Sequence, residues 1–165
     1  MAVLFVTVGV PGSGKSYFAE KLCKERGLVH LRSDKIRDIV FPKPTYKPGE
    51  NNKLFGLIDF LVVELLSKGV GVVYDANFTK KIHRTEMARI AKKNGAQYAV
   101  LWIKTPLSVA LKRVKARKYH KIGKRVVFGI HEETEYPHNE PVVVLDGTKS
   151  YRSQKRLFKQ YFRAA

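Results

Sequence analysis

The sequence of 165 residues contains one cysteine, Cys23. A single thiol cannot form an intramolecular disulfide or build a thiolate zinc site, which excludes a small secreted fold held together by disulfides. We therefore expect a cytoplasmic protein that depends on a hydrophobic core for its stability. Hydrophobic residues make up 44% of the chain, which is enough for one core. At this length, residues 1–165 are expected to form a single domain.

Long hydrophobic runs are also missing. The N-terminal apolar segment Ala2–Val10 has no basic region before it and leads directly into a glycine-rich segment, so it does not resemble a signal peptide. The apolar segment Leu54–Leu66 is only 13 residues long and contains Asp59 and Glu64, so it is too short and too charged to span a bilayer. We expect no membrane partner.

Acidic residues are scarce, with 14 Asp and Glu against 32 Lys and Arg, which gives a formal net charge of +18 at pH 7. Between Glu86 and Glu132 there is no acidic residue, yet this stretch holds twelve Lys or Arg, eight of them in Lys112–Arg125. Such a charge balance favours a polyanionic partner such as nucleic acid or a nucleotide. A general need for solubility is the alternative explanation of the charge.

Short runs of β-branched or aromatic residues alternate with helical patterns along the chain. The expected strands are Val3–Gly9, Leu28–Arg32, Val70–Asp75, Gln97–Lys104 and Pro141–Asp146. The expected helices are Lys15–Arg26, Asp34–Val40, Asn52–Lys68, Lys80–Asn94, Leu107–Lys118 and Ser150–Arg163. This alternation, with strands that are apolar nearly throughout, predicts a doubly wound α/β domain with a five-stranded, mostly parallel sheet and helices on both faces.

Residues Gly9–Ser16 fit the pattern G-x-x-x-x-G-K-[ST] and lie between an expected strand and an expected helix. Glycines let the backbone N–H groups turn toward phosphates, and the N-terminus of the following helix favours the same anion. The Lys15 ammonium would reach the β- and γ-phosphates, and the Ser16 hydroxyl would be a ligand of Mg²⁺. The residues expected to bind the nucleotide are Pro11, Gly12, Ser13, Gly14, Lys15, Ser16, Tyr17 and Arg113.

Two acidic residues follow expected strands, where ligands bind in open parallel sheets. Asp34 could accept the proton of an attacking hydroxyl, or it could cap the helix that follows. Asp75 could assist Mg²⁺, cap the next helix or anchor Arg37. Arg37 itself, one turn beyond Asp34, could bind a phosphate or lie in solvent.

Arg113 and Arg117 are four residues apart in an expected helix and would therefore face the same way. They precede a basic segment with Gly123, so we expect a basic lid at about residues 113–127. One well-placed arginine can raise a phosphoryl transfer rate by about 10³-fold or more. A solvated basic helix face is the alternative, and Arg125 is a third candidate for the phosphate contact.

Four segments in chain order resemble those of the P-loop 5′-hydroxyl polynucleotide kinases, namely GVPGSGKS, RSDKIR, YDANFT and KRVKAR. The resemblance covers nearly the whole chain and implies a P-loop kinase fold. It also implies that Asp34 is the general base, that Arg37 binds a phosphate on the acceptor side and that Asp75 supports the site. By the same resemblance, Arg117 of the lid contacts the phosphoryl group in transfer.

The sequence is thus interpreted as a kinase that uses ATP, or another nucleoside triphosphate, with Mg²⁺. Lys15, Asp34 and Arg117 are the expected catalytic residues, and Arg37 and Asp75 are expected to bind the substrate. The expected acceptor is the 5′-hydroxyl end of RNA or DNA, since a groove that follows a phosphate backbone needs many cations. The alternatives are a small-molecule hydroxyl kinase for a nucleoside, antibiotic or sugar nucleotide, and a nucleic-acid-binding ATPase that transfers nothing.

Overall fold

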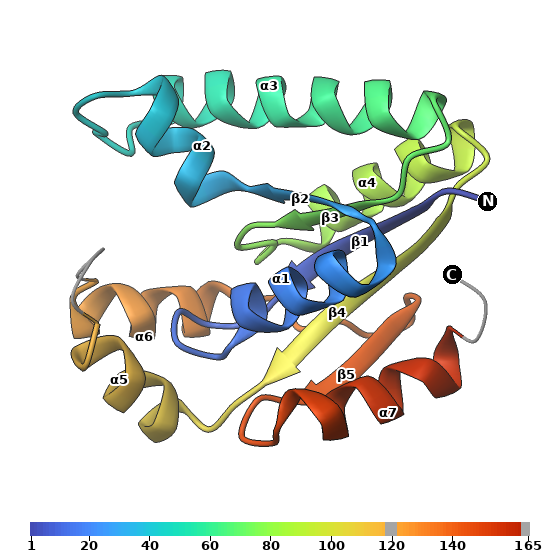
Figure 1. Ribbon diagram of the computed structural model, residues 1–165. Helices are drawn as coiled ribbons and strands as arrows, with labels where there is room; N and C mark the ends of the chain where they lie inside the picture. Colours follow the sequence, from blue (N-terminus) through green and yellow to red (C-terminus); the bar gives the residue numbers. More distant parts are fainter. Residues whose placement is uncertain (118–121, 163–165) are drawn as a thin grey trace.

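A computed structural model describes residues 1–117 and 122–162 (Figure 1). Its sheet has the strand order β2-β3-β1-β4-β5, and every neighbouring pair is parallel. The prediction of a single α/β domain with a five-stranded sheet is confirmed, and the sheet proves to be parallel throughout. The strands are β1 (Val3–Val8), β2 (Val29–Arg32), β3 (Val72–Asp75), β4 (Gln97–Lys104) and β5 (Val142–Asp146).

Helices cover both faces of the sheet, as the doubly wound prediction requires (Figure 1). On one face α3 and α4 pack against the sheet, and on the other face α1 and α7 do so. The helices are α1 (Lys15–Arg26), α2 (Ser33–Val40), α3 (Pro48–Ser67), α4 (Lys81–Lys93), α5 (Leu107–Lys115), α6 (Lys124–Glu133) and α7 (Tyr151–Tyr161).

The central strand β1 is buried on both faces, which explains why its sequence is apolar nearly throughout. Successive side chains of a strand point to opposite faces of the sheet. Accordingly, Leu4 and Val6 contribute to the core under α3 and α4, whereas Val3 and Phe5 contribute to the core under α1 and α7. The two cores hold β1 at the centre of the sheet, directly before the glycine-rich segment.

The helix boundaries differ most from the prediction in α3, α5 and α7. Helix α3 begins at Pro48, four residues before the expected start, because a proline fits the first turn of a helix and Glu50 favours its positive end. Helix α5 ends at Lys115, where Ala116 is its C-cap, so the expected helix over 107–118 is too long. Helix α7 begins after Ser150, whose hydroxyl caps it, and ends at Tyr161.

Helix α6 was not predicted, and it begins at Lys124, the last residue of the basic segment that contains Gly123. Gly123 is its N-cap, and Val127 of α6 is buried in a small core with Val10 and Val114. The expected lid at about 113–127 therefore consists of the end of α5 and the start of α6. Its middle, residues 118–121, lies outside the described residues.

Within the described part of the chain, none of the helices combines the length and the apolar character that crossing a membrane requires. The carboxyl ends of all five parallel strands meet at one edge of the sheet. The segments that follow β1, β2, β3 and β4 therefore come together there, and they contain most of the candidate site residues.

Candidate functional site

A pocket of about 340 Å³ lies at the carboxyl edge of the sheet. It brings together six residues that the sequence singled out, namely Pro11, Lys15, Ser16, Asp34, Asp75 and Arg117. The remaining walls come from residues that the sequence did not indicate, namely Arg32, Ser33, Ala76, Asn77 and Ile122. Residues from four separate segments of the chain thus surround one cavity.

The glycine-rich segment forms a tight loop whose shape depends on two glycines. Gly12 and Gly14 have φ values of 87° and 101°, in the left-handed region that side chains rarely adopt. A Cβ atom on Gly12 would lie 2.4 Å from the carbonyl oxygen of Ala110, so no side chain fits there. The Ser13 amide donates to the Val10 carbonyl over 3.0 Å and closes the turn.

The start of α1 has the properties of an anion site. Gly14 is its N-cap and provides no side-chain hydrogen bond, and the first turn contains no acidic residue. The Ser13 hydroxyl is buried and has no hydrogen-bond partner among the described residues. Free helical N–H groups, an unpartnered buried hydroxyl and the Lys15 ammonium form a donor set that fits the phosphates of a nucleotide.

Burial lowers the pKa of Lys15, and the positive charge of Arg117 lowers it further. The carboxylates of Asp75 and Asp34 act in the opposite direction and favour the charged form. An ammonium group that is partly removed from water in this way gains from an additional anion. The electrostatics of Lys15 therefore also fit a bound phosphate.

Asp75 is 4% exposed and ends β3. Its carboxylate accepts a hydrogen bond from Thr7 Oγ1 over 2.9 Å, and His30 Nε2 lies 3.2 Å from its other oxygen. Burial by itself raises the pKa of Asp75, but the hydrogen bonds from His30 and Ser16 and the charge of Lys15 outweigh burial and lower it. Asp75 is thus an ionised carboxylate, and it lines the pocket together with Ser16.

Asp34 lies in the first turn of α2, and its carboxylate forms an ion pair with Arg32 at the end of β2. Burial alone raises the pKa of Asp34, but the hydrogen bonds and charge of Arg32 and the Lys35 amide lower it overall. The N-cap of α2 is Arg32, so Asp34 does not cap the helix in the usual manner, although it does accept the Lys35 amide over 2.8 Å. It is an ionised carboxylate, able to accept a proton.

Arg37 lies outside this pocket. It is 6% exposed, forms an ion pair with Glu50 and donates to Asn51 Oδ1 over 2.7 Å. The Tyr46 ring lies against its guanidinium, 4.6 Å from the ring centroid. These contacts hold α2 against the start of α3. Substrate binding by Arg37 stays a prediction, and Asp75, which bonds Thr7 and His30, does not anchor Arg37.

The two lid arginines do not face the same way, because α5 ends between them. Arg113 Nη1 donates to the Gly147 carbonyl over 2.9 Å and lies 3.4 Å from the carbonyls of Gly12 and Ser13. Arg113 therefore connects the glycine-rich loop to Gly147, which follows β5. Arg117 is exposed and lines the pocket next to Lys15.

Tyr17, also expected to bind the nucleotide, is 57% exposed and is not among the residues that line the pocket. The Lys21 ammonium lies 5.1 Å from its ring centroid. The prediction for Tyr17 stays open.

Among the residues the structure describes, no group of three or more His, Cys, Asp or Glu side chains could hold a metal ion. Mg²⁺ often takes one or two protein ligands and completes its shell with phosphate oxygens and water. The Ser16 hydroxyl and the Asp75 carboxylate both line this pocket, and they are the groups in it that fit such a role.

Sequence reasoning missed Thr7, His30 and Arg32, which position the two carboxylates. A signal was present, since all three lie on strands that end at this edge of the sheet. Strands β2 and β1 flank β3, and Arg32 of β2 is paired with Asp75 of β3. Once this strand order is known, the residues that lie beside Asp75 can be predicted.

Residues 4–133 match the family described as AAA domain. One curated relative is an L-seryl-tRNA(Sec) kinase of Methanococcus maripaludis, 26% identical over 157 residues. The match covers 89% of this chain but only 60% of the relative, so the chain spans less than two thirds of that protein.

Solved structures of kinases share the fold. A sugar kinase from Janibacter has a TM-score of 0.77 at 16% identity, with 100% of this chain and 96% of that one covered. A chain of the Pnkp1/Rnl/Hen1 RNA repair complex has a TM-score of 0.72 at 23% identity, with 82% and 44% covered. At these identities the likeness concerns the fold alone. Since the family match covers most of the chain, the protein belongs to the AAA domain family and has a P-loop kinase fold.

Proposed function

We propose that the protein is an ATP-dependent kinase that transfers the γ-phosphate to a 5′-hydroxyl end of nucleic acid. The observation that carries the proposal is the pocket in which Lys15, Asp34 and Arg117 surround one cavity. A phosphoryl transfer site needs cations around the phosphate and a carboxylate that can orient and deprotonate the attacking hydroxyl.

Each of these residues has a distinct task. The loop amides and Lys15 bind the phosphates, and Ser16 and Asp75 would hold Mg²⁺, which supplies charge neutralisation when bound. Asp34 accepts the hydroxyl proton of the acceptor while that oxygen bonds to phosphorus and the bond from phosphorus to the leaving ADP oxygen breaks. Arg117 stabilises the charge on the phosphoryl group in transfer.

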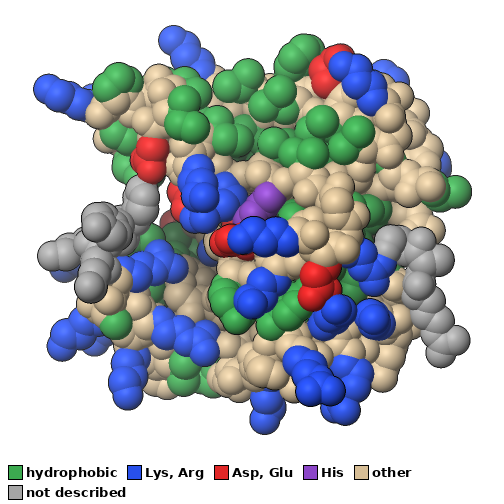
Figure 2. Space-filling model, in the orientation of Figure 1, with side chains coloured by type: hydrophobic (Ala, Val, Ile, Leu, Met, Phe, Trp, Pro, Cys, Tyr) green, Lys and Arg blue, Asp and Glu red, His purple; other side chains and the backbone are tan. Residues whose placement is uncertain are grey.

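Charge supports a nucleic acid as acceptor. The formal net charge is +18, and Lys and Arg side chains gather over α5 and α7 on the face drawn in Figure 2. A small acceptor does not need such a surface, whereas a phosphate backbone does. The relative named as a kinase of L-seryl-tRNA(Sec) points in the same direction.

That relative also favours a second candidate acceptor, the seryl hydroxyl of an aminoacylated tRNA. Both candidates use the same pocket residues, because each acceptor is a primary hydroxyl carried by RNA. They differ in the position of this hydroxyl, which lies at the 5′ end in one case and on the aminoacyl group in the other.

The test is transfer of γ-labelled phosphate from Mg-ATP to matched RNA and DNA oligonucleotides that carry a 5′-hydroxyl or a 5′-phosphate, with seryl-tRNA as a further acceptor. Label on 5′-hydroxyl ends alone is the expected result. Label on seryl-tRNA alone would replace the first candidate with the second. No label on any nucleic acid, with ATP still bound, would overturn both.

A further inference from the structure

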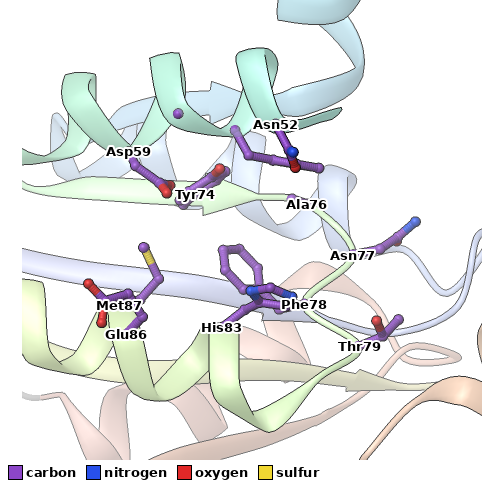
Figure 3. A pocket seen from close by; sticks show the side chains of 12 residues that line it. Asn52, Asp59, Tyr74, Ala76, Asn77, Phe78, Thr79, His83, Glu86 and Met87 are labelled. Carbon is purple, nitrogen blue, oxygen red and sulfur yellow. The ribbon is translucent and has the colours of Figure 1, made fainter. Parts of the chain in front are cut away.

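A second pocket, of about 560 Å³, lies between α3 and α4 above the end of β3 (Figure 3). It shares Ala76 and Asn77 with the phosphate pocket, so the two cavities meet at the segment that follows β3. A ligand could therefore occupy this pocket while its reactive hydroxyl extends toward Asp34. Its volume falls within the range of about 300–1,000 Å³ that is usual for small-ligand sites.

The walls of this pocket combine aromatic surface with hydrogen-bonding groups. Tyr74 and Phe78 lie between the two helices, as Figure 3 shows, with ring centroids 4.8 Å apart. Phe55 on α3 also lines the pocket and is 36% exposed, whereas Tyr74 and Phe78 are buried. The polar groups come from Asn52, Asp59, His83 and Glu86.

The charge of this pocket is opposite to that of the protein. Its lining residues all belong to the described part of the chain, and none of them is Lys or Arg, although the net charge is +18. Two carboxylates line it instead. A phosphate would be repelled there, whereas a neutral group with N–H donors would be bound.

Asp59 is the carboxylate available for such a donor. Both oxygens of Glu86 already accept hydrogen bonds from Arg89, at 3.0 and 2.7 Å. Burial raises the pKa of Asp59, although the Tyr74 hydroxyl acts in the opposite direction. A carboxylate has two oxygens and accepts several hydrogen bonds, so Asp59 keeps capacity for a donor from a ligand.

Gly56 lines this pocket and is exposed. It lies in the interior of α3, where a glycine costs about 1 kcal/mol relative to alanine. A Cβ atom at this position would meet nothing within 4 Å, so the protein itself leaves space for a larger side chain. Gly56 thus weakens the helix, although no neighbouring group requires a glycine there. Such a glycine fits a role in admitting a ligand.

We propose that this pocket binds the nucleobase of the acceptor's terminal nucleotide, with the base against the aromatic side chains and an exocyclic amino group donating to Asp59. The inference rests on the proposed function for the identity of the acceptor. Stacking on aromatic side chains accepts any base, and a carboxylate that accepts from an amino group selects cytosine over uracil.

The test is saturation-transfer NMR with cytidine and uridine, recorded with a non-hydrolysable ATP analogue at saturation so that the donor site is filled. These two nucleosides have the same size and differ in the amino group. With the wild type, cytidine should bind about tenfold more tightly than uridine, the usual effect of one hydrogen bond to a charged group.

Two variants and a control locate the binding. Gly56→Leu should abolish the cytidine signal, and Asp59→Asn should remove the preference for cytidine over uridine. Gly129→Leu is the matched control, because Gly129 also lies in a helix and does not line this pocket. A Cβ atom added to Gly129 would likewise meet nothing within 4 Å. Circular dichroism checks that each variant is folded.

The outcomes separate the two proposals. Unchanged cytidine binding by Gly56→Leu, or no cytidine binding by the wild type, would overturn the nucleobase pocket. Cytidine binding without phosphoryl transfer to any nucleic acid would leave the pocket in place and count against the proposed function alone. Transfer that is the same in the wild type and in Gly56→Leu would count against the pocket alone.

Discussion

Arg32 holds the Asp34 carboxylate at two points, with Nε 3.1 Å from Oδ1 and Nη2 2.8 Å from Oδ2. Paired hydrogen bonds of this kind fix both the position and the charge of a carboxylate. The two residues are only two positions apart, across the junction of β2 and α2. Arg32 is thus a positioning residue for the proposed base.

The first prediction concerns the pH dependence of Arg32→Gln. The hydrogen bonds and charge of Arg32 lower the pKa of Asp34 below its ordinary value of 3.8, so the wild-type base is ionised throughout the neutral range. Without Arg32, only the Lys35 amide opposes burial and the charge of Asp75, so this pKa should rise. The acid limb of the kcat/KM profile should move to higher pH, with less change above it. An acid limb at the wild-type position would show that Asp34 is not the titrating base.

The second prediction compares Lys15→Ala with Asp34→Asn. Both should reduce transfer by about 10²-fold or more, the usual contribution of a general base or a phosphate-binding cation. Only Lys15→Ala should also weaken ATP binding, because Lys15 lies at the start of α1 beside the glycine-rich loop, whereas Asp34 is the proposed base for the acceptor hydroxyl. Equilibrium binding of a labelled ATP analogue separates the two effects. Near-normal turnover by Asp34→Asn would remove it as the base.

The third prediction concerns the glycine-rich loop. Gly12→Ala places a Cβ atom 2.4 Å from a backbone carbonyl at a φ of 87°, so the loop must distort and ATP binding should be lost. Gly27→Ala is the matched control, since Gly27 has a φ of 65° and nothing within 4 Å of its Cβ. That change should cost about 1 kcal/mol of stability and leave ATP binding intact. Equal ATP affinities of the two variants would contradict the close packing of this loop.

The fold could be predicted in most respects, because hydrophobic periodicity is a local property of the chain. All five strands were expected within three residues of their observed ends. Helix α6 was missed because its basic first turn and Gly129 resemble a loop, and its apolar contacts are with Val10 and Val114, far away in sequence. A sequence pattern within the helix itself does not reveal such long-range contacts.

The site could be predicted only in part for the same reason. Asp75 ends β3, and Lys15 and Asp34 lie in the first turns of the helices that follow β1 and β2, so their convergence follows from a parallel sheet. The partners of Arg37 were not predictable, because Glu50 and Asn51 approach it across a turn rich in proline. The separation of Arg113 from Arg117 depends on where α5 ends, and helix ends are the least predictable feature.

The fourth prediction concerns Thr7, whose hydroxyl is fully buried and donates to Asp75 over 2.9 Å. Thr7→Val leaves this carboxylate with one donor fewer, which should cost about 1–3 kcal/mol of unfolding free energy at pH 7. The pKa of Asp75 is lowered in the folded protein, so its stabilising effect is present at neutral pH and lost as pH falls through the folded pKa. The difference between wild type and Thr7→Val in urea unfolding should therefore shrink below about pH 4. An undiminished difference at low pH would assign the effect to packing.

The fifth prediction separates the two lid arginines. Arg117→Ala should lower kcat by about 10³-fold with little change in ATP affinity, because Arg117 is exposed at the pocket and acts on charge that develops during transfer. Arg113→Ala should instead lower the melting temperature and weaken ATP binding, because three backbone carbonyls, of Gly12, Ser13 and Gly147, then lose their common donor. Steady-state kinetics and thermal unfolding with and without ATP measure both effects. If Arg117→Ala weakened ATP binding and left kcat unchanged, Arg117 would bind the phosphate of the ground state and not that of the transition state.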